Sequence, residues 1–238
     1  MNTEHIVKSF DEDLKKLDNI IAEMGGLAEV QLADAVDALI KRDTELADRV
    51  IAGDKKIDAL ETEMDNMATT TLALRQPMAD DLRVTITALR TASLIERIGD
   101  YAKNIAKRSV VLSQNPPLGP AKSINRMATL VQGMIKDVLD AYVARDVNKA
   151  EAVRARDADA DLLHTSLFRE ILTYMMEDPR TITSCTHLLF VAKNLERIGD
   201  HATNIAENVY YLVNGALPTD EREKSDASSF TVVDPDGD

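Results

Sequence analysis

The sequence has no Trp, a single Cys, and few residues that interrupt helices, with only 9 Gly and 7 Pro among 238 residues. Aromatic residues make up 4 % of the chain although hydrophobic residues make up 45 %. This composition, rich in Ala and Leu, is typical of a helix bundle. The one cysteine, Cys185, excludes an internal disulfide framework and fits a reducing compartment. We expect Cys185 to be a small core residue near the start of a helix.

An excess of positive charge and a long apolar run are also missing. The net charge of −13 predicts that nucleic acids and anionic lipid surfaces are repelled, which favours cations and basic protein surfaces as partners. Residues 1–18 do not resemble a signal peptide, and no window approaches the roughly 18 apolar residues of a membrane-spanning helix. We therefore expect a soluble, intracellular protein that meets a membrane only through its partners.

One stretch of the sequence occurs twice. Residues 94–100 read Leu-Ile-Glu-Arg-Ile-Gly-Asp and residues 194–200 read Asn-Leu-Glu-Arg-Ile-Gly-Asp. The match continues with four further identities at the same spacing, since Ala102, Asn104, Ile105 and Ala106 recur as Ala202, Asn204, Ile205 and Ala206. The chain is therefore an internal duplication.

Hydrophobic periodicity predicts the same order of helices in both halves. The first half shows helices at about 5–41, 45–74 and 79–112, with a turn at Pro77 and a Pro-rich linker at 116–120. The second half shows helices at about 122–144, from the Arg145-Asp146 pair to about Met176, and at 183–213. We predict an all-α fold of two similar three-helix bundles, residues 1–115 and 116–216. Residues 217–238 are expected to form a disordered acidic tail that carries little of the function.

Four pairs of acidic residues share a spacing that places both members on one helical face. They are Asp54 and Asp58, Glu96 and Asp100, Asp157 and Asp161, and Glu196 and Asp200. By helical rotation, Glu96 and Asp100 lie opposite the apolar stripe of their helix. This row of acids is therefore expected to face outward.

The turns predict how the acid pairs meet. Asp58 lies 19 residues before Pro77 and Glu96 lies 19 after it, whereas Asp54 and Asp100 lie 23 residues away on either side. About Pro179 the corresponding separations are 18 and 17, then 22 and 21. Antiparallel hairpins at both turns would bring two acid pairs together, and four carboxylates at one level require a cation. A hard divalent or trivalent metal with oxygen ligands is the predicted occupant.

Several residues near these pairs have simpler interpretations. The acids themselves are a solvated face if the duplicated spacing has no role. Arg97 and Arg197 are interpreted as local salt-bridge partners, and Gly99 and Gly199 as sites of close helix packing. Among the histidines only His201, which follows Asp200, is a candidate ligand. The sequence contains no Gly-rich phosphate loop, nucleophile elbow or Glu-x-x-His pair, so catalysis has little support and we expect no enzyme.

In combination, these motifs resemble the PhoU family of regulators of bacterial phosphate uptake. The resemblance covers about residues 5–215 and includes Leu74-Arg75-Gln76-Pro77 followed by Asp81-Leu82-Arg83 at the first turn. Membership implies a cytoplasmic protein that binds multinuclear iron, zinc or manganese clusters through the eight paired acids. It also implies a negative regulator that links the ATPase-containing Pst phosphate ABC transporter to a PhoR-type sensor histidine kinase, commonly as a homodimer or higher oligomer. The second turn, Glu177-Asp178-Pro179-Arg180, departs from the family pattern, so the two sites are expected to differ.

Two other classes of protein remain open at this point. A di-metal carboxylate oxidase also gathers acids from several helices of a bundle. It is disfavoured because the acids are expected to face away from the core and because the Glu-x-x-His ligands are missing. A helical scaffold without metal would explain the same sequence if the acidic rows are interaction surface alone.

Overall fold

The structure of the chain is a computed structural model that describes residues 3–219, 226 and 228. Every element within this part of the chain is helical. The first half contains α1 (Thr3–Lys41), α2 (Thr44–Gly53), α3 (Lys55–Arg75) and α4 (Asp80–Leu112). The second half contains α5 (Ala121–Ala144), α6 (Val147–Ala155), α7 (Asp157–Glu177), the 3₁₀ turn η1 (Pro179–Thr181) and α8 (Ile182–Asn214).

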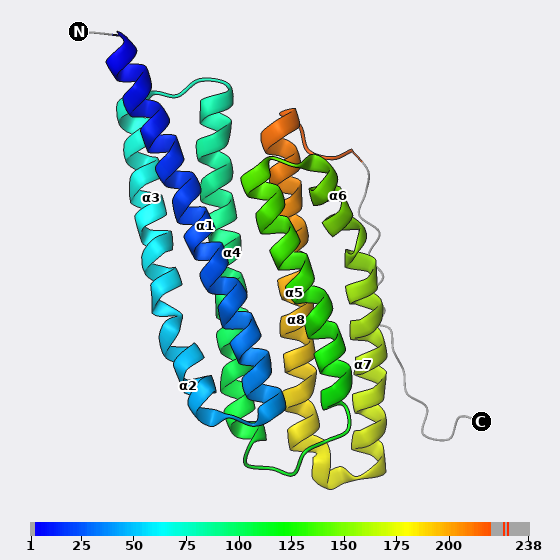
Figure 1. The fold of residues 1–238 in the computed structure, drawn as a ribbon. Coiled ribbons are helices and arrows are strands. Elements are labelled where there is room, and N and C mark those ends of the chain that lie inside the picture. Colours follow the sequence, from blue (N-terminus) through cyan, green and yellow to red (C-terminus); the bar gives the residue numbers. More distant parts are fainter. Residues whose placement is uncertain (1–2, 220–225, 227, 229–238) are drawn as a thin grey trace.

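The helices form two bundles that stand side by side (Figure 1). In each bundle a short helix and a long helix run one after the other in the same direction, α2 with α3 and α6 with α7. Each such pair takes the place of one helix in a three-helix bundle, with α1 and α4 in the first and with α5 and α8 in the second. The bundles meet where α4 packs on α8 and α1 on α5. Helices α4 and α8 run antiparallel, as the contacts Thr91–Asn208 and Tyr101–His201 show. The predicted fold of two duplicated three-helix bundles is confirmed.

The predicted second helix of each repeat is wrong in one respect, because both are interrupted. Helix α2 ends at Gly53 and α3 begins after Asp54, while α6 ends before Arg156 and α7 begins at Asp157. Gly and Asp are poor residues for a helix interior, whereas Asp is favoured at a helix N-terminus, where its charge meets the positive end of the helix dipole. The interruption places one acid of each candidate site at the start of a helix.

The Arg-Asp pair of each repeat ends one helix and begins the next. Arg42 and Arg145 have φ of 57° and 54°, in the left-handed region that ends a helix. Asp43 then accepts a hydrogen bond from the Leu46 N–H at 2.9 Å, and Asp146 from the Lys149 N–H at 3.0 Å. These carboxylates satisfy backbone donors at the first turn of α2 and α6. Asp43 is thus the N-cap of α2 and Asp146 the N-cap of α6.

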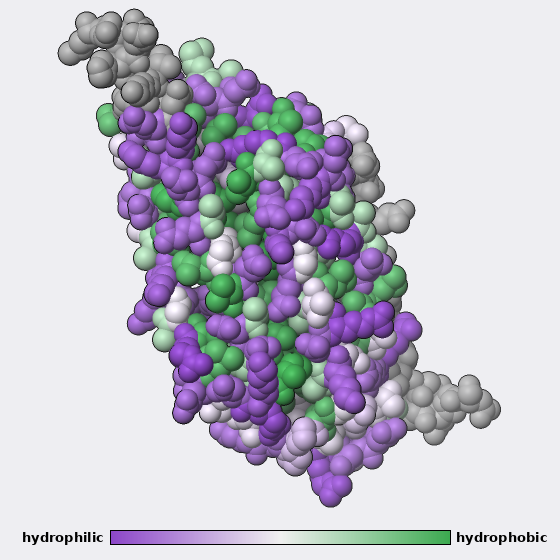
Figure 2. Space-filling view, viewed as in Figure 1, coloured by the Kyte–Doolittle hydropathy of each residue, from purple (hydrophilic) through white to green (hydrophobic). Residues whose placement is uncertain are grey.

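The core consists of aliphatic side chains supplied by every long helix. Ala88, Ile95, Ile98, Ala102 and Ile105 of α4 are buried, as the apolar stripe predicts, and so is Cys185 at the start of α8. Hydrophilic residues predominate on the face shown in Figure 2, with hydrophobic residues scattered among them. The bundles therefore share one apolar interior along the α4–α8 contact.

Polar contacts also join the two bundles. The Arg145 guanidinium at the end of α5 donates to both carboxylate oxygens of Asp18 in α1 at 2.8 Å. Burial raises the pKa of Tyr142 to about 12, and Asp18 adds to the rise. None of the described helices is long and apolar enough to cross a membrane. Most of the expected acidic tail lies outside the described residues, but Asp226 and Ser228 are described, and Asp226 contacts Asp161 of the second bundle.

Candidate functional site

The eight predicted ligands gather in two clusters, one in each bundle. The first acid cluster consists of Asp54, Asp58, Glu96 and Asp100, and its acids come from the α2–α3 junction, α3 and α4. The second acid cluster consists of Asp157, Asp161, Glu196 and Asp200, and its acids come from α7 and α8. In the first bundle, Lys103 links Asp54 to Asp100. In the second, Asp226 links Asp161 to Lys193, which pairs with Glu196.

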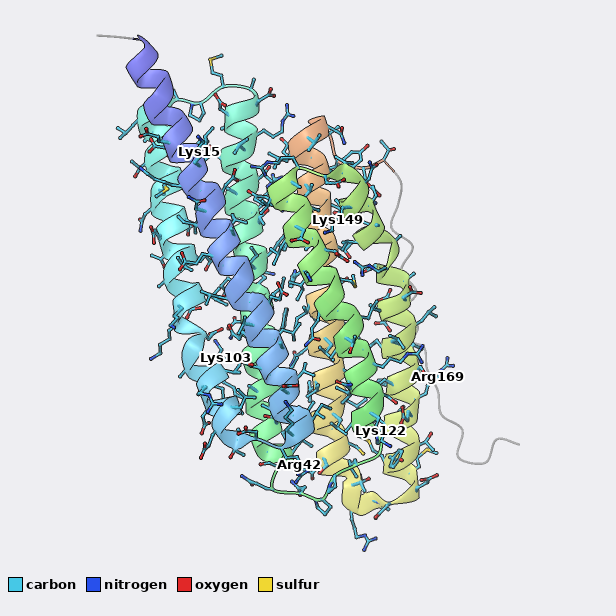
Figure 3. The ribbon with its side chains drawn as sticks, in the orientation of Figure 1. Lys15, Arg42, Lys103, Lys122, Lys149 and Arg169 are labelled. Carbon is cyan, nitrogen blue, oxygen red and sulfur yellow. The ribbon has the colours of Figure 1, made fainter. Side chains whose placement is uncertain are left out.

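Asp54 is the most buried acid of the first acid cluster, with 3 % of its surface exposed. The amide of Gln31 in α1 donates to Asp54 Oδ1 at 2.9 Å and to the Gly99 carbonyl at 3.2 Å. Lys103 of α4 bridges Asp54 and Asp100, and its Nζ lies 2.6 Å from Asp100 Oδ1. Figure 3 shows Lys103 beside the α2–α3 junction. Burial disfavours the charged form of Lys103 and lowers its pKa. Hydrogen bonds to Asp100 and Asp54, with their negative charges, outweigh this effect and hold the pKa of Lys103 above its usual range.

Glu96 faces several carboxylates at once. Burial raises its pKa, and the negative charges of Asp100, Glu61 and Asp58 raise it further, to about 7. Burial and Asp65 likewise raise the pKa of Glu61, which lies one turn from Asp58 on α3. Glu61 is thus a fifth acid of this region. A cation held between these groups would remove the repulsion that shifts both pKa values.

The second acid cluster is more deeply buried. Asp157, Asp161 and Glu196 have 2 %, 4 % and 7 % of their surface exposed. Thr203 of α8 donates to Asp157 Oδ1 at 3.1 Å, and Lys193 Nζ lies 2.9 Å from Glu196 Oε1. The other oxygen of Glu196 is buried and has no hydrogen-bond partner among the described residues. Burial raises the pKa of Glu196, Lys193 opposes this rise, and Asp200 adds to it.

Asp226, from the C-terminal segment, lies against the second acid cluster. Its backbone N–H donates to Asp161 Oδ2 at 3.2 Å, and its carboxylate lies 3.5 Å from Lys193 Nζ and 3.4 Å from His164 Nδ1. Burial opposes ionisation of Asp226. Hydrogen bonds with Ser228 and the charges of His164 and Lys193 outweigh burial and hold the pKa of Asp226 below its usual range.

The prediction that the acids face outward is wrong for half of them. Asp58 is exposed and Asp100 keeps 46 % of its side chain accessible, but Asp54, Asp157, Asp161 and Glu196 are buried. The reason is that α3 and α7 close over the polar side of α4 and α8, so that the helices bury this side as well as the apolar stripe. The outward orientation of the acids therefore no longer argues against an oxidase. The absence of Glu-x-x-His ligands from the sequence still does.

The glycines of the two motifs differ in their surroundings. A Cβ at Gly99 would lie 3.0 Å from Ile57 Cδ1 and 3.4 Å from Asp54 Oδ1, so the missing side chain lets Asp54 approach α4. A Cβ at Gly199 would meet its nearest neighbour, Ala160, at an ordinary 3.8 Å. The interpretation as a site of close packing is supported at Gly99, whereas Gly199 has room for a methyl group.

Several neighbours of the acids had no distinctive sequence signal. They are Gln31, Glu61, Lys103, His164, Lys193 and Asp226. His201, the expected candidate, is buried and stacks on Tyr101 with ring centroids 5.6 Å apart, and neither of its ring nitrogens has a hydrogen-bond partner in the described part of the chain. Burial, with Arg97, lowers the pKa of His201. The histidine near the acids is instead His164, which occupies the position of Glu61 under the 103-residue offset between the repeats.

The residues present fit a metal by their chemistry. Both clusters offer carboxylate oxygens, and in the first acid cluster burial, followed by the negative charges of neighbouring acids, raises the pKa of Glu96. Within the part of the chain that the structure describes, no three Asp, Glu, His or Cys side chains already converge on one point as a metal would require. Rotation of exposed side chains such as Asp58 and Asp100 would be part of binding.

Comparisons with known proteins agree on one family. A profile described as the PhoU domain matches residues 21–109 and 124–209. A "Phosphate-specific transport system accessory protein PhoU homolog" of Caulobacter vibrioides (strain NA1000 / CB15N) is 51 % identical over 228 residues, covering 95 % of this chain and 99 % of the relative. The protein of the same name from Rhizobium meliloti (strain 1021) is 51 % identical over 230 residues, with coverage of 96 % and 97 %.

Two solved structures share the fold. The crystal structure of PhoU from Pseudomonas aeruginosa has a TM-score of 0.84 and 39 % identity, covering 87 % of this chain and 100 % of that one. The crystal structure of the phosphate transport system regulatory protein PhoU from Streptococcus pneumoniae has a TM-score of 0.82 and 30 % identity, with coverage of 88 % and 99 %.

Proposed function

The chain belongs to the PhoU family, and from that membership we propose that it is a non-enzymatic accessory regulator of phosphate-specific transport. The observation that carries the proposal is the 51 % identity, over 95 % of the chain, to a relative named as an accessory protein of that system. The absence of a nucleotide-binding or hydrolytic motif from the sequence agrees with a regulator that acts through contacts with other proteins.

In finer terms, the chain is a negative regulator of the phosphate-starvation response. It links the ATPase subunit of the Pst phosphate ABC transporter to a PhoR-type sensor histidine kinase, in the cytoplasm and as a homodimer or higher oligomer. The family resemblance supports these assignments. The net charge of −13 favours partners that present basic surfaces.

The acid clusters would hold multinuclear iron, zinc or manganese. Asp54, Asp58, Glu96 and Asp100 would hold one cluster, and Asp157, Asp161, Glu196 and Asp200 the other. Bound metal would neutralise these carboxylates and tie α3 to α4 and α7 to α8. The like-charge repulsion around Glu96 supports this proposal, because oxygen ligands with surplus negative charge suit hard cations.

Elemental analysis tests the metal proposal. The protein is purified without chelator or affinity metal, as the parent and as Asp100→Asn with Asp200→Asn. Several equivalents of iron, zinc or manganese are expected in the parent and at most half as many in the variant. Asp48→Asn with Asp159→Asn is the matched control, since these acids are exposed, lie one in each repeat, on α2 and α7, and belong to neither cluster.

Binding to detergent-solubilised transporter and to the sensor kinase tests the regulatory proposal separately. The folded parent is expected to co-purify with the ATPase subunit and with the kinase. A parent that carries metal but binds neither protein would contradict the adaptor role. Unchanged metal content in the Asp100→Asn/Asp200→Asn variant would contradict the assigned ligands.

A further inference from the structure

Three donor groups beside the second acid cluster surround one carboxylate. His164 Nδ1 lies 3.4 Å and Thr165 Oγ1 lies 3.5 Å from Asp226 Oδ1, and Lys193 Nζ lies 3.5 Å from Asp226 Oδ2. His164 and Thr165 are themselves buried, with 3 % and 7 % of their surface exposed. A carboxylate that is 17 % exposed and meets an ammonium, an imidazole and a hydroxyl has the contacts of a bound ligand.

Two of these three donors are confined to the second repeat, whereas Thr165 has a counterpart in Thr62. Under the offsets between the repeats, the position of His164 is taken by Glu61 in the first repeat and that of Lys193 by Ser93. Glu61 would repel a carboxylate, and Ser93 instead hydrogen-bonds with Glu61. The duplicated fold thus carries a carboxylate-binding arrangement on one side only.

The position of Asp226 also affects the neighbouring acids. Its backbone N–H donates a hydrogen bond to Asp161 Oδ2, and the Lys193 ammonium forms ion pairs with both Asp226 and Glu196. We propose that His164, Thr165 and Lys193 form a carboxylate-binding site for an acidic peptide segment, that the chain's own Asp226 fills it, and that the filled site restricts access of cations to the second acid cluster. The last part rests on the metal binding proposed above.

The occupant is the chain's own C-terminal segment because the structure places Asp226 there. The segment around it reads Glu223-Lys224-Ser225-Asp226-Ala227-Ser228. Ser228 N–H donates to Asp226 Oδ1 at 2.9 Å, so a donor of the same segment also holds this carboxylate. An Asp-x-Ser sequence in another acidic peptide would hold its carboxylate in the same way.

Limited proteolysis of the full chain tests the site without reference to metal. Trypsin cleaves after Arg222 and Lys224, which precede Asp226. Lys193→Gln is expected to increase the cleavage rate several-fold, because the ammonium that holds Asp226 is lost while the cleaved sequence is unchanged. Lys107→Gln, an exposed lysine of α4, is the matched control and is expected to match the parent.

Asp226→Asn is a second test of the anchor. Free peptides of residues 217–230, with and without the Asp226→Asn substitution, correct for any direct effect of this change on trypsin. After this correction the full-length variant is expected to be cleaved several-fold faster than the parent. Equal rates for the parent, Lys193→Gln and Asp226→Asn would overturn the carboxylate-binding site.

Binding of Mn²⁺ alone tests the restriction of access. In an Asp58→Asn/Asp100→Asn background the first acid cluster keeps only two of its four acids and the second is intact. Adding Asp226→Asn is expected to increase Mn²⁺ affinity several-fold. Unchanged or weaker binding would overturn the access role. A parent that binds no Mn²⁺ at either cluster would contradict the metal proposal, and the proteolysis would still decide whether the carboxylate-binding site exists.

Discussion

In the first acid cluster the Lys103 ammonium bridges Asp54 and Asp100, whereas the equivalent residue of the second acid cluster is Thr203, whose hydroxyl donates to Asp157. The positive charge of the second cluster comes from Lys193, which lies one helical turn before Glu196 in α8, whereas Thr203 lies after it. Duplication has thus preserved the acids while moving the cation that accompanies them. Each set of acids therefore depends on a different neighbour for its stability.

The largest expected effect comes from giving the first acid cluster the residue of the second. Lys103→Thr leaves Asp54 buried without its ammonium, which is expected to cost about 3 kcal/mol of unfolding free energy. Chemical denaturation in the presence of chelator measures the loss. Lys149→Thr is the control and is expected to lose little stability, because this lysine pairs with Asp137 and Asp140 at the surface, where solvent screens the charges.

A second substitution separates loss of charge from loss of packing at this site. Asp54→Asn combined with Lys103→Thr removes the uncompensated carboxylate and is expected to restore part of the lost stability. A loss below about 1 kcal/mol for Lys103→Thr alone would show that the ion pair between Lys103 and Asp54 is as weak as a solvent-screened surface pair. The two clusters would then not differ in the way described.

An intermediate effect is expected at Glu96, where the pKa is raised to about 7. The folded protein holds this proton at pH values where the unfolded chain has lost it, so stability falls as the pH rises from about 4.3 to about 7. In metal-free protein, Glu96→Gln is expected to be more stable than the parent above pH 7, by about 1 kcal/mol after discounting for solvent screening. The two proteins should converge below about pH 4.5.

Glu196→Gln makes the corresponding change in the second acid cluster. Glu196 faces Lys193, which opposes the rise in its pKa, whereas the acids around Glu96, namely Asp58, Glu61 and Asp100, all add to the rise. The gain above pH 7 is therefore expected to be smaller for Glu196→Gln than for Glu96→Gln. Thermal melting of both variants across pH 4 to 9, with the exposed Glu63→Gln as control, would contradict the prediction if the order were reversed.

The smallest effect is expected at the glycines of the two motifs. Gly199→Ala is expected to stabilise the protein by about 0.5 to 1 kcal/mol, because Ala favours a helix and its methyl group has room. Gly99→Ala is expected to gain nothing, because the methyl group would press on Ile57 and approach Asp54. Equal gains at both positions, measured by denaturation, would show that Gly99 is not needed for the approach of Asp54.

Local sequence signals predicted the helices, because periodicity, the Arg-Asp junctions and the prolines each act over a few residues. The meeting of the acid pairs also followed, because a hairpin converts separations along the chain into neighbours in space. The interruption at Arg156-Asp157 did not follow, since neither residue forbids a helix interior. Lys103 and Lys193 were missed because a helical lysine is usually solvated, and Asp226 because its contact with Asp161 spans 65 residues without periodicity.

The antiparallel contact of α4 with α8 fixes the distance between the clusters. Tyr101 stacks on His201, and Asn208 donates to Thr91 at 3.3 Å, so residues 96 and 106 of α4 lie level with about 206 and 196 of α8. Glu96 and Glu196 are therefore about ten residues, or about 15 Å, apart along the helix axes. Neither cluster can shift relative to the other unless α4 slides along α8. The α4–α8 register therefore makes the separation of the two acid clusters a fixed dimension of the fold.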